Sequence, residues 1–187
     1  TDAVRTRRGS HSSERDSRGN TVPAVSTPHA LIMATPVTDA RSARWTYTWH
    51  AHAGADGRPA IEAFATTLAP SPWIGGRAAF QVMPSALPTP PADPSARRLS
   101  FRHRDEYDRV HHYRVELDTG IPGASAPIVA ELAPSRTGVT MRFTLPGGGS
   151  VLFDRLGDGD VEIRPRPQPA RGAIVTGWVH QRADDGR

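Results

Sequence analysis

The chain has 187 residues, a hydrophobic fraction of 37% and no cysteine. This length is sufficient for one domain with its own core, and the absence of cysteine excludes a disulfide framework, a thiolate nucleophile and a cysteine-ligated zinc site. Every one of the 23 basic residues is arginine, and they are scattered among acidic residues rather than gathered in a stripe, so the net charge of +4 does not predict a nucleic-acid partner. No apolar run reaches the roughly 18 residues that a membrane-spanning helix requires.

The N-terminal part of the chain differs in composition from the rest. Residues 1–19 are polar, rich in arginine and serine, and show no hydrophobic period. We therefore expect a disordered arm over residues 1–19 and a folded domain over residues 20–187.

The earlier half of the expected domain contains short apolar segments broken by prolines. Trp45–His50 alternates large and small residues, which predicts a strand with its aromatic side chains on one face. Ala30–Ala34 is a short continuous apolar run and is expected to be buried, whereas Ile61–Leu68 is compatible with a helical turn or a strand. The prolines of Pro84–Pro94 indicate an exposed irregular loop.

The later half has a cleaner strand signal, because apolar and polar residues alternate in several short segments. Glycine-containing turns separate these segments, and the 18 prolines and 17 glycines of the chain favour short strands over long helices. The pattern predicts an all-β fold, an antiparallel sandwich. The segments are Tyr113–Leu117, Val129–Leu132, Met141–Leu145 and Val161–Arg164.

The stretch Pro70–Pro84 presents Trp73 from a stiff loop and then enters a strand around Phe80–Met83. Pro70 and Pro72 fix the backbone before the indole, so little entropy would be lost when a ligand binds. An indole on such a loop is either a platform for a sugar or a hydrophobic plug over the edge of the sandwich. From the residue type alone, the plug is favoured.

A run of titratable side chains begins at His103 and includes Asp105, Glu106, His111 and His112. Such groups can bind a metal ion or carry out acid–base chemistry. Their spacing fits no compact zinc signature, so a polar loop with hydrogen-bonding roles is favoured.

Two other sets of carboxylates are weaker candidates. Asp154, Asp158 and Asp160 resemble an oxygen-rich calcium loop, but the EF-hand pattern fails and a turn with Asx hydrogen bonds is favoured. Glu62 and Glu131 could form a carboxylate pair for glycoside hydrolysis, although nothing local singles them out.

Taken together, several short phrases resemble the N-terminal domain of glycoside hydrolase family 92, the α-mannosidase family. They keep their order and cover most of residues 19–178. The phrases are Gly19–His29, Thr35–Thr38, Pro70–Gly75, Phe80–Pro84, Phe101–His103 with Glu106, Tyr113–Val115, Ala130–Pro134, Arg142–Pro146 and Ser150–Asp154.

This resemblance implies a supersandwich similar to galactose mutarotase, here lacking its last strands. It also implies a secreted or cell-surface enzyme that uses calcium and inverts α-mannosides with a catalytic acid and base. In the family both groups belong to an (α/α)6 barrel that follows the sandwich, so we expect no catalytic residue and no metal ligand in this chain. The resemblance places Trp73 in the mannoside pocket, with Trp49 and His50 as weaker candidates.

The chain departs from the family pattern in two places. Ala30 stands where members commonly have glycine, and Ser135–Thr137 replaces a Thr-Asp-His-like triplet. Two alternatives to the mannosidase domain therefore stay open. One is a stand-alone carbohydrate-binding or adhesion module without activity, and the other is an unrelated enzyme with a metal site in the His103–His112 region.

Overall fold

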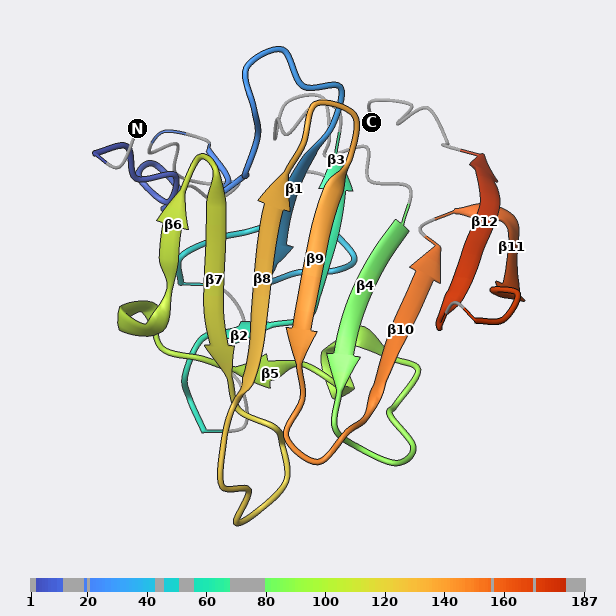
Figure 1. The fold of residues 1–187 in the computed structure, drawn as a ribbon. Helices are drawn as coiled ribbons and strands as arrows, with labels where there is room; N and C mark the ends of the chain where they lie inside the picture. Colours follow the sequence, from blue (N-terminus) through green and yellow to red (C-terminus); the bar gives the residue numbers. More distant parts are fainter. Residues whose placement is uncertain are drawn as a thin grey trace.

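The computed structural model of the chain consists of antiparallel β-sheets (Figure 1). It describes residues 3–11, 19, 21–42, 46–50, 56–67, 80–155, 157–169 and 171–180. In these ranges the helical elements are short 3-10 turns at Pro94–Ala96 and His103–Asp105, and no helix is long and apolar enough to cross a membrane. The prediction of an all-β antiparallel fold is confirmed.

One four-stranded sheet has the strand order β1-β3-β4-β10. Its pairs are all antiparallel, and Phe64 of β3 lies opposite Val82 of β4. The strands are β1 (Met33–Val37), β3 (Ala63–Thr67), β4 (Phe80–Ser85) and β10 (Ser150–Arg155).

The second four-stranded sheet has the order β6-β7-β8-β9 and lies in front of the first in Figure 1. Its apolar residues alternate with polar ones, so Tyr113, Val115 and Leu117 are buried while their neighbours face outward. The strands are β6 (Tyr107–Arg109), β7 (His112–Leu117), β8 (Ile128–Pro134) and β9 (Val139–Thr144).

The core lies between these two sheets. Phe64 of the first sheet meets Phe143 of the second with ring centroids 5.5 Å apart. A small pair of strands, β2 (Ala60–Ile61) and β5 (Leu99–Ser100), adds Ile61 and Leu99 to the same cluster. The core therefore joins both sheets and the short pair beneath them.

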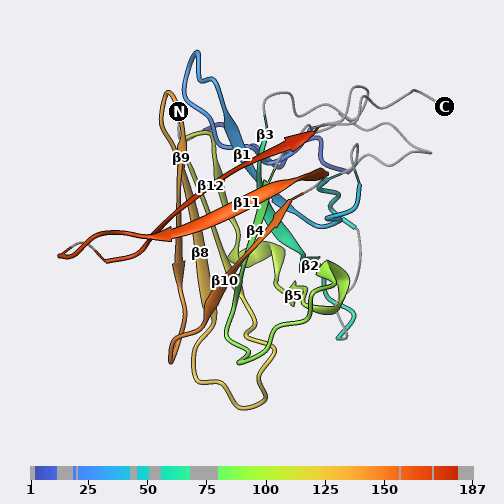
Figure 2. The same ribbon diagram turned by 90° about the vertical axis from the view of Figure 1, so that its right-hand side faces the viewer.

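The hairpin formed by β11 (Asp158–Pro165) and β12 (Ala173–His180) is a separate two-stranded sheet. In Figure 1 it lies to the right of β10, and Figure 2 shows it crossing that side of the sandwich. Much of its surface is exposed, including the side chains of Ile163, Ile174 and Trp178.

Two sequence predictions are wrong in the described residues. Residues 46–50 form no strand, because the segment is irregular and turns at Trp49 and His50. In the run Ala30–Ala34, Ala34 is buried but Leu31 is 69% exposed, since the strand β1 begins only after it.

Two boundaries also differ from expectation. Pro84 pairs with Val151 inside the first sheet, so the expected proline-rich loop begins after Ser85. The ambiguous segment Ile61–Leu68 is extended over its described residues, because both β2 and β3 form there.

A matched pair of leucine substitutions tests where the core lies. Leu132 is fully buried, so Leu132→Ala should lower the free energy of unfolding by about 3 kcal/mol through lost burial and a cavity. Leu31→Ala should change it by less than about 0.5 kcal/mol, because Leu31 is exposed. Urea denaturation of both variants checks this, and a similar loss in the two would contradict the position of the core.

Candidate functional site

The side chain of Glu106 lies at the centre of a buried hydrogen-bond network. Its Oε1 accepts hydrogen bonds from the hydroxyl groups of Tyr113 at 2.6 Å and Tyr47 at 3.1 Å. Its Oε2 accepts one from Arg7 at 2.8 Å and lies 2.7 Å from Nδ1 of His103. A carboxylate can be buried to this degree because its charge is paired and its oxygens have donors. We call these residues the Glu106 cluster.

The N-terminal segment 3–11 is held against β6 beside this cluster. Asp108, which is buried, accepts a hydrogen bond from the backbone N–H of Arg7 at 3.2 Å and one from the side chain of Arg5 at 3.2 Å. The Arg7 guanidinium also donates to the backbone oxygen of His103 at 2.8 Å. The described part of the expected arm, residues 3–11 and 19, therefore has specific partners in the domain.

The indole of Trp49 stacks on the Glu106 cluster. The ring of His103 is 3.5 Å from it with the planes 6° apart, and His11 stacks at 5.2 Å. The guanidinium carbon of Arg7 lies 5.2 Å from the indole centroid. The Trp49 backbone is fixed as well, because its N–H donates to Ser10 at 2.9 Å and its carbonyl oxygen lies 3.0 Å from Nε2 of His103.

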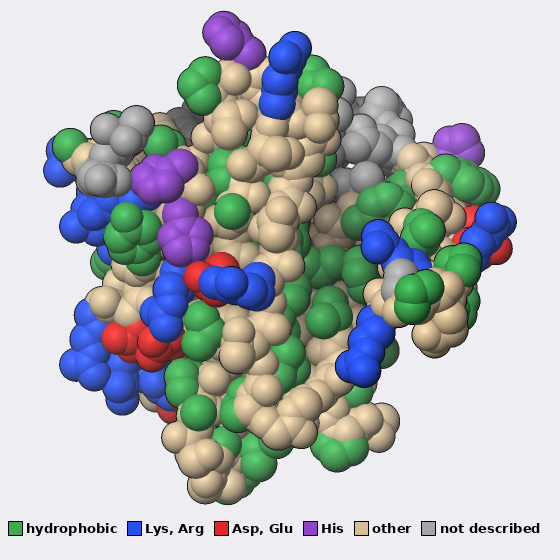
Figure 3. Space-filling model, viewed as in Figure 1, with side chains coloured by type: hydrophobic (Ala, Val, Ile, Leu, Met, Phe, Trp, Pro, Cys, Tyr) green, Lys and Arg blue, Asp and Glu red, His purple; other side chains and the backbone are tan. Residues whose placement is uncertain are grey.

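Of the predicted site residues, Trp49 and His50, which are neighbours in the sequence, lie within the described residues. His50 is exposed and meets the ring of His11 edge-on at 5.1 Å. In Figure 3, histidine and arginine side chains gather on the side of the molecule that carries β6. Trp73, the first candidate, lies outside the described residues.

The charges of the cluster shift several pKa values. Burial, and then the negative charge of Glu106, raise the pKa of both Tyr47 and Tyr113 well above the ordinary value. Although burial opposes its charge, the carboxylates of Glu106 and Asp108 raise the pKa of Arg7. Burial alone would raise the pKa of Asp108, but the hydrogen bonds from Arg7 outweigh this effect and lower the pKa of that carboxyl. The two tyrosines are therefore protonated donors at neutral pH.

This arrangement suits positioning rather than proton transfer to a substrate. Both oxygens of Glu106 have partners within the chain and its side chain has no exposed surface, whereas a general acid must reach the reacting group. Both ring nitrogens of His103 also have oxygen partners within the chain, on Glu106 and Trp49, so the ring is held in place. The cluster instead fixes the half-buried Trp49 beside the exposed His50.

Sequence reasoning missed part of this cluster. Arg7 lies in the polar segment without a hydrophobic period, and its partner Glu106 is 99 residues away, so no local pattern connects them. Tyr47 belongs to an aromatic alternation that predicted a strand. The run His103–Glu106 was the available signal, and its favoured interpretation was a polar loop with hydrogen-bonding roles.

An open groove of about 420 Å³ lies on the other side of the sandwich, between the sheets and β12. Figure 3 shows it as a hollow lined with hydrophobic side chains near the hairpin. Its described lining is mostly apolar, with Thr66 and Thr176 as the polar side chains. Its lining residues are Phe64, Thr66, Phe80, Val82, Met141, Phe153, Val175, Thr176 and Gly177.

Comparison with known protein families decides the identity of this sandwich. Residues 3–182 match the glycosyl hydrolase family 92 N-terminal domain. The chain belongs to glycosyl hydrolase family 92. The match extends over nearly the whole chain and confirms the resemblance found in the sequence. No curated protein matches the chain.

Solved structures of family 92 proteins share the fold. An inverting mannosidase from Bacteroides thetaiotaomicron has a TM-score of 0.73 and 23% identity over 95% of this chain, and this match covers 22% of that protein. The glycosyl hydrolase ccman5 gives a TM-score of 0.62, 20% identity, and coverage of 87% of this chain and 22% of that one. An α-mannosidase, also from B. thetaiotaomicron, has a TM-score of 0.58 and 22% identity, and the match covers 78% of this chain and 18% of that protein. The chain therefore spans only about a fifth of the first two relatives.

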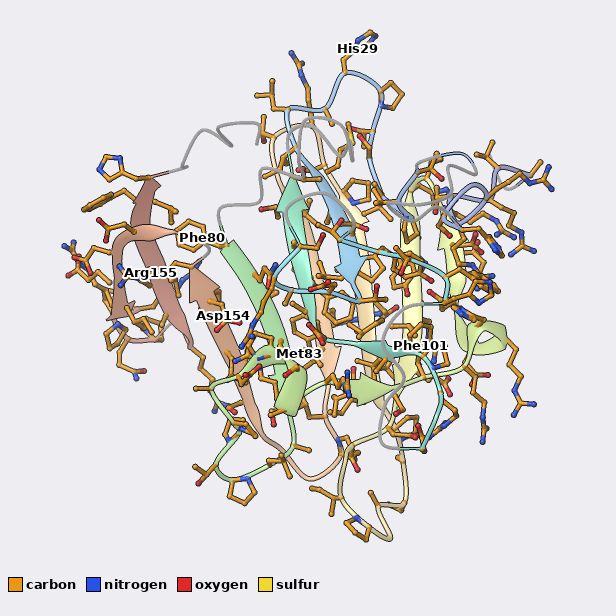
Figure 4. All side chains as sticks on the ribbon, turned by 180° about the vertical axis from the view of Figure 1, so that it is seen from behind. His29, Phe80, Met83, Phe101, Asp154 and Arg155 are labelled. Atoms are coloured by element: carbon orange, nitrogen blue, oxygen red, sulfur yellow. The ribbon has the colours of Figure 1, made fainter. Side chains whose placement is uncertain are left out.

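One departure from the family 92 pattern has no conformational cost in the structure. Ala30 replaces a common glycine, but the left-handed backbone in this loop belongs to His29, with a φ of 58°. Figure 4 shows His29 at the tip of the loop, away from the sheets. The second departure is the triplet Ser135–Thr137. Its first residue, Ser135, closes the turn between β8 and β9 through hydrogen bonds with the backbone of Gly138.

The structure does not bring the two candidate glutamates together. Glu62, beside β3 of the first sheet, accepts a hydrogen bond from the backbone of Ala40 at 2.9 Å. Glu131, in the second sheet, is held by Arg142 at 2.6 Å, and hydrogen bonds from Arg142 lower its pKa. Inversion of a glycoside requires two carboxylates across one substrate. Glu62 and Glu131 do not provide this arrangement.

The described residues contain no group of three or more histidine, aspartate or glutamate side chains that could hold a metal ion. Asp154 forms an ion pair with the buried Arg97, and Asp160 accepts a hydrogen bond from the N–H of Val161 at 2.8 Å. These residues do not fit a calcium site, so no catalytic step in this part of the chain is assigned to calcium.

The raised pKa values of Tyr47 and Tyr113 predict a loss of stability in alkali. The unfolded chain loses these protons near pH 10, while the folded chain keeps them, so their contribution is complete below about pH 10 and declines as the pH rises. Urea denaturation between about pH 8 and pH 11 should show this decline, with a shallower slope in Tyr47→Phe because one titrating group is gone. Equal slopes in the variant and the original chain would contradict the burial of this hydroxyl group.

Proposed function

We propose that this chain is the sugar-contacting N-terminal domain of a family 92 α-mannosidase and contributes Trp49 and His50 to its mannoside pocket. The observation that carries this proposal is the fixed position of Trp49, which stacks 3.5 Å from His103 while His103 is bound to the buried Glu106. An aromatic side chain fixed before binding loses little entropy when a ligand arrives. The mannosidases among the family 92 relatives support an α-mannoside as the class of ligand.

The geometry limits how a mannoside approaches Trp49. His103 and His11 both stack on the indole and the Arg7 guanidinium also lies over it, so the sugar contacts the edge of the ring. The exposed rings of His11 and His50 lie beside that position and offer hydrogen bonds to sugar hydroxyl groups. Trp73 is a further proposed contact from the loop that precedes β4.

The catalytic acid and base belong, in this proposal, to an (α/α)6 barrel that accompanies the domain in the complete enzyme. Family 92 relatives are mannosidases several times longer than the matched domain, which supports a separate catalytic part. In this proposal, the calcium of the complete enzyme also binds outside the described residues. The complete protein is secreted or displayed on the cell surface. The domain by itself should release no mannose from an α-mannoside.

Substitution of Trp49 tests the proposal in the complete mannosidase. Trp49→Ala should raise KM for an aryl α-mannoside about tenfold, equivalent to about 1.4 kcal/mol of lost binding, with a smaller change in kcat. Tyr107→Ala is the matched control, because Tyr107 is an exposed aromatic residue on β6 and is not part of the proposed pocket.

Circular dichroism of both variants verifies that the fold is intact. An unchanged KM in a folded Trp49→Ala enzyme would show that Trp49 is a packing residue, and hydrolysis by residues 1–187 alone would place catalytic groups in this chain.

A further inference from the structure

The segment 38–42, which follows β1, is hydrogen-bonded to the backbone just before Trp49. The N–H of Thr38 donates to the carbonyl oxygen of Thr46 at 2.8 Å. The side-chain oxygen of Thr38, which is buried, accepts a hydrogen bond from the N–H of Thr48 at 3.1 Å. The backbone that leads to the indole therefore depends on the position of Thr38.

Glu62 holds the segment 38–42 against the first sheet. This residue is buried and lies between β2 and β3. Its backbone N–H donates to the carbonyl oxygen of Val37 at 2.8 Å, and its carboxylate Oε2 accepts a hydrogen bond from the N–H of Ala40 at 2.9 Å. Glu62 therefore contacts the chain on both sides of Thr38.

A second buried polar side chain, Gln81 of β4, binds the same residue of this segment. Its Nε2 donates to the carbonyl oxygen of Ala40 at 3.2 Å, while its Oε1 is buried without a hydrogen-bond partner among the described residues. Ala40 packs in an apolar cluster with Val37, Ala63 and Ala65. An unpaired polar atom destabilises such a place, so these contacts favour a role in fixing Ala40 over a role in stability alone.

We propose that Glu62 and Thr38 are positioning residues of the mannoside site. They hold Trp49 and His50 from the first sheet, while the Glu106 cluster holds the same segment from the other side. Both side chains are buried, so each acts through the backbone before the indole and not by touching the sugar. This inference rests on the proposed function of Trp49, and a contact that is fixed in advance loses less entropy on binding.

Substitution of Thr38 in the complete mannosidase tests this inference. Thr38→Val removes the acceptor of the Thr48 N–H and should raise KM for an aryl α-mannoside about fivefold, with little change in kcat. Thr38→Ser keeps the hydroxyl group and should retain the original KM. In the Trp49→Ala background, Thr38→Val should raise KM by less than about twofold, because its effect passes through the indole.

Thr35→Val is the matched control for Thr38→Val. Thr35 is a buried threonine of β1, and its hydroxyl group donates to the neighbouring carbonyl oxygen of Pro36 at 3.0 Å. This substitution removes the same chemical group from the same sheet and should leave KM unchanged. Circular dichroism verifies that each variant is folded.

A pair of Glu62 variants gives a second test, which decides the question even where Thr38→Val does not fold. Glu62→Gln keeps an oxygen that can accept the Ala40 N–H, so KM should stay within about twofold and kcat should be unchanged. Glu62→Leu removes the acceptor and should raise KM about fivefold. A loss of kcat in Glu62→Gln would show that Glu62 takes part in the chemistry and would overturn a positioning role.

The outcomes separate this inference from the proposed function. A raised KM in Trp49→Ala with an unchanged KM in folded Thr38→Val and Glu62→Leu would overturn the inference alone. An equal rise in Thr38→Val and Thr35→Val would show a general structural effect and would also overturn it. An unchanged KM in folded Trp49→Ala would overturn the proposed function and this inference with it.

Discussion

The buried carboxylate of Glu106 is the interaction on which one side of this domain depends. It joins the N-terminal segment through Arg7, the irregular segment 46–50 through Tyr47, and the second sheet through Tyr113. Desolvation makes an unpaired carboxylate costly, so these segments must converge for the charge to be buried. Trp49 obtains its fixed position from the same network, since His103 contacts both Glu106 and the indole.

The two sides of the sandwich therefore differ in chemistry. The side with β6 has a saturated polar network beneath aromatic and histidine side chains, which suits the recognition of a polar ligand. The opposite side has an apolar groove and a hairpin with exposed apolar side chains such as Ile163, Ile174 and Trp178.

The sequence predicted the parts of the fold that local patterns determine. In segments such as Tyr113–Leu117, apolar and polar residues alternate because one face of the strand is buried and the other faces solvent. These segments form the expected strands. The segment 46–50 does not form the strand that its alternation predicts. Its conformation is determined instead by the contacts of Tyr47 and Trp49 with residues more than fifty positions away. For the candidate site, the family resemblance pointed first to Trp73, which lies outside the described residues, and more weakly to Trp49 and His50. Arg7 had no local signal, and its role required the folded structure.

A double-mutant cycle between Arg7 and Glu106 tests the central claim most directly. The free energy of unfolding is measured for the original chain, Arg7→Met, Glu106→Gln and the double variant. If the pair unites the N-terminal segment with the domain, the coupling energy should exceed about 1 kcal/mol, because the two groups share one buried contact. Effects that add within about 0.3 kcal/mol would show that the two residues act independently and would contradict the account.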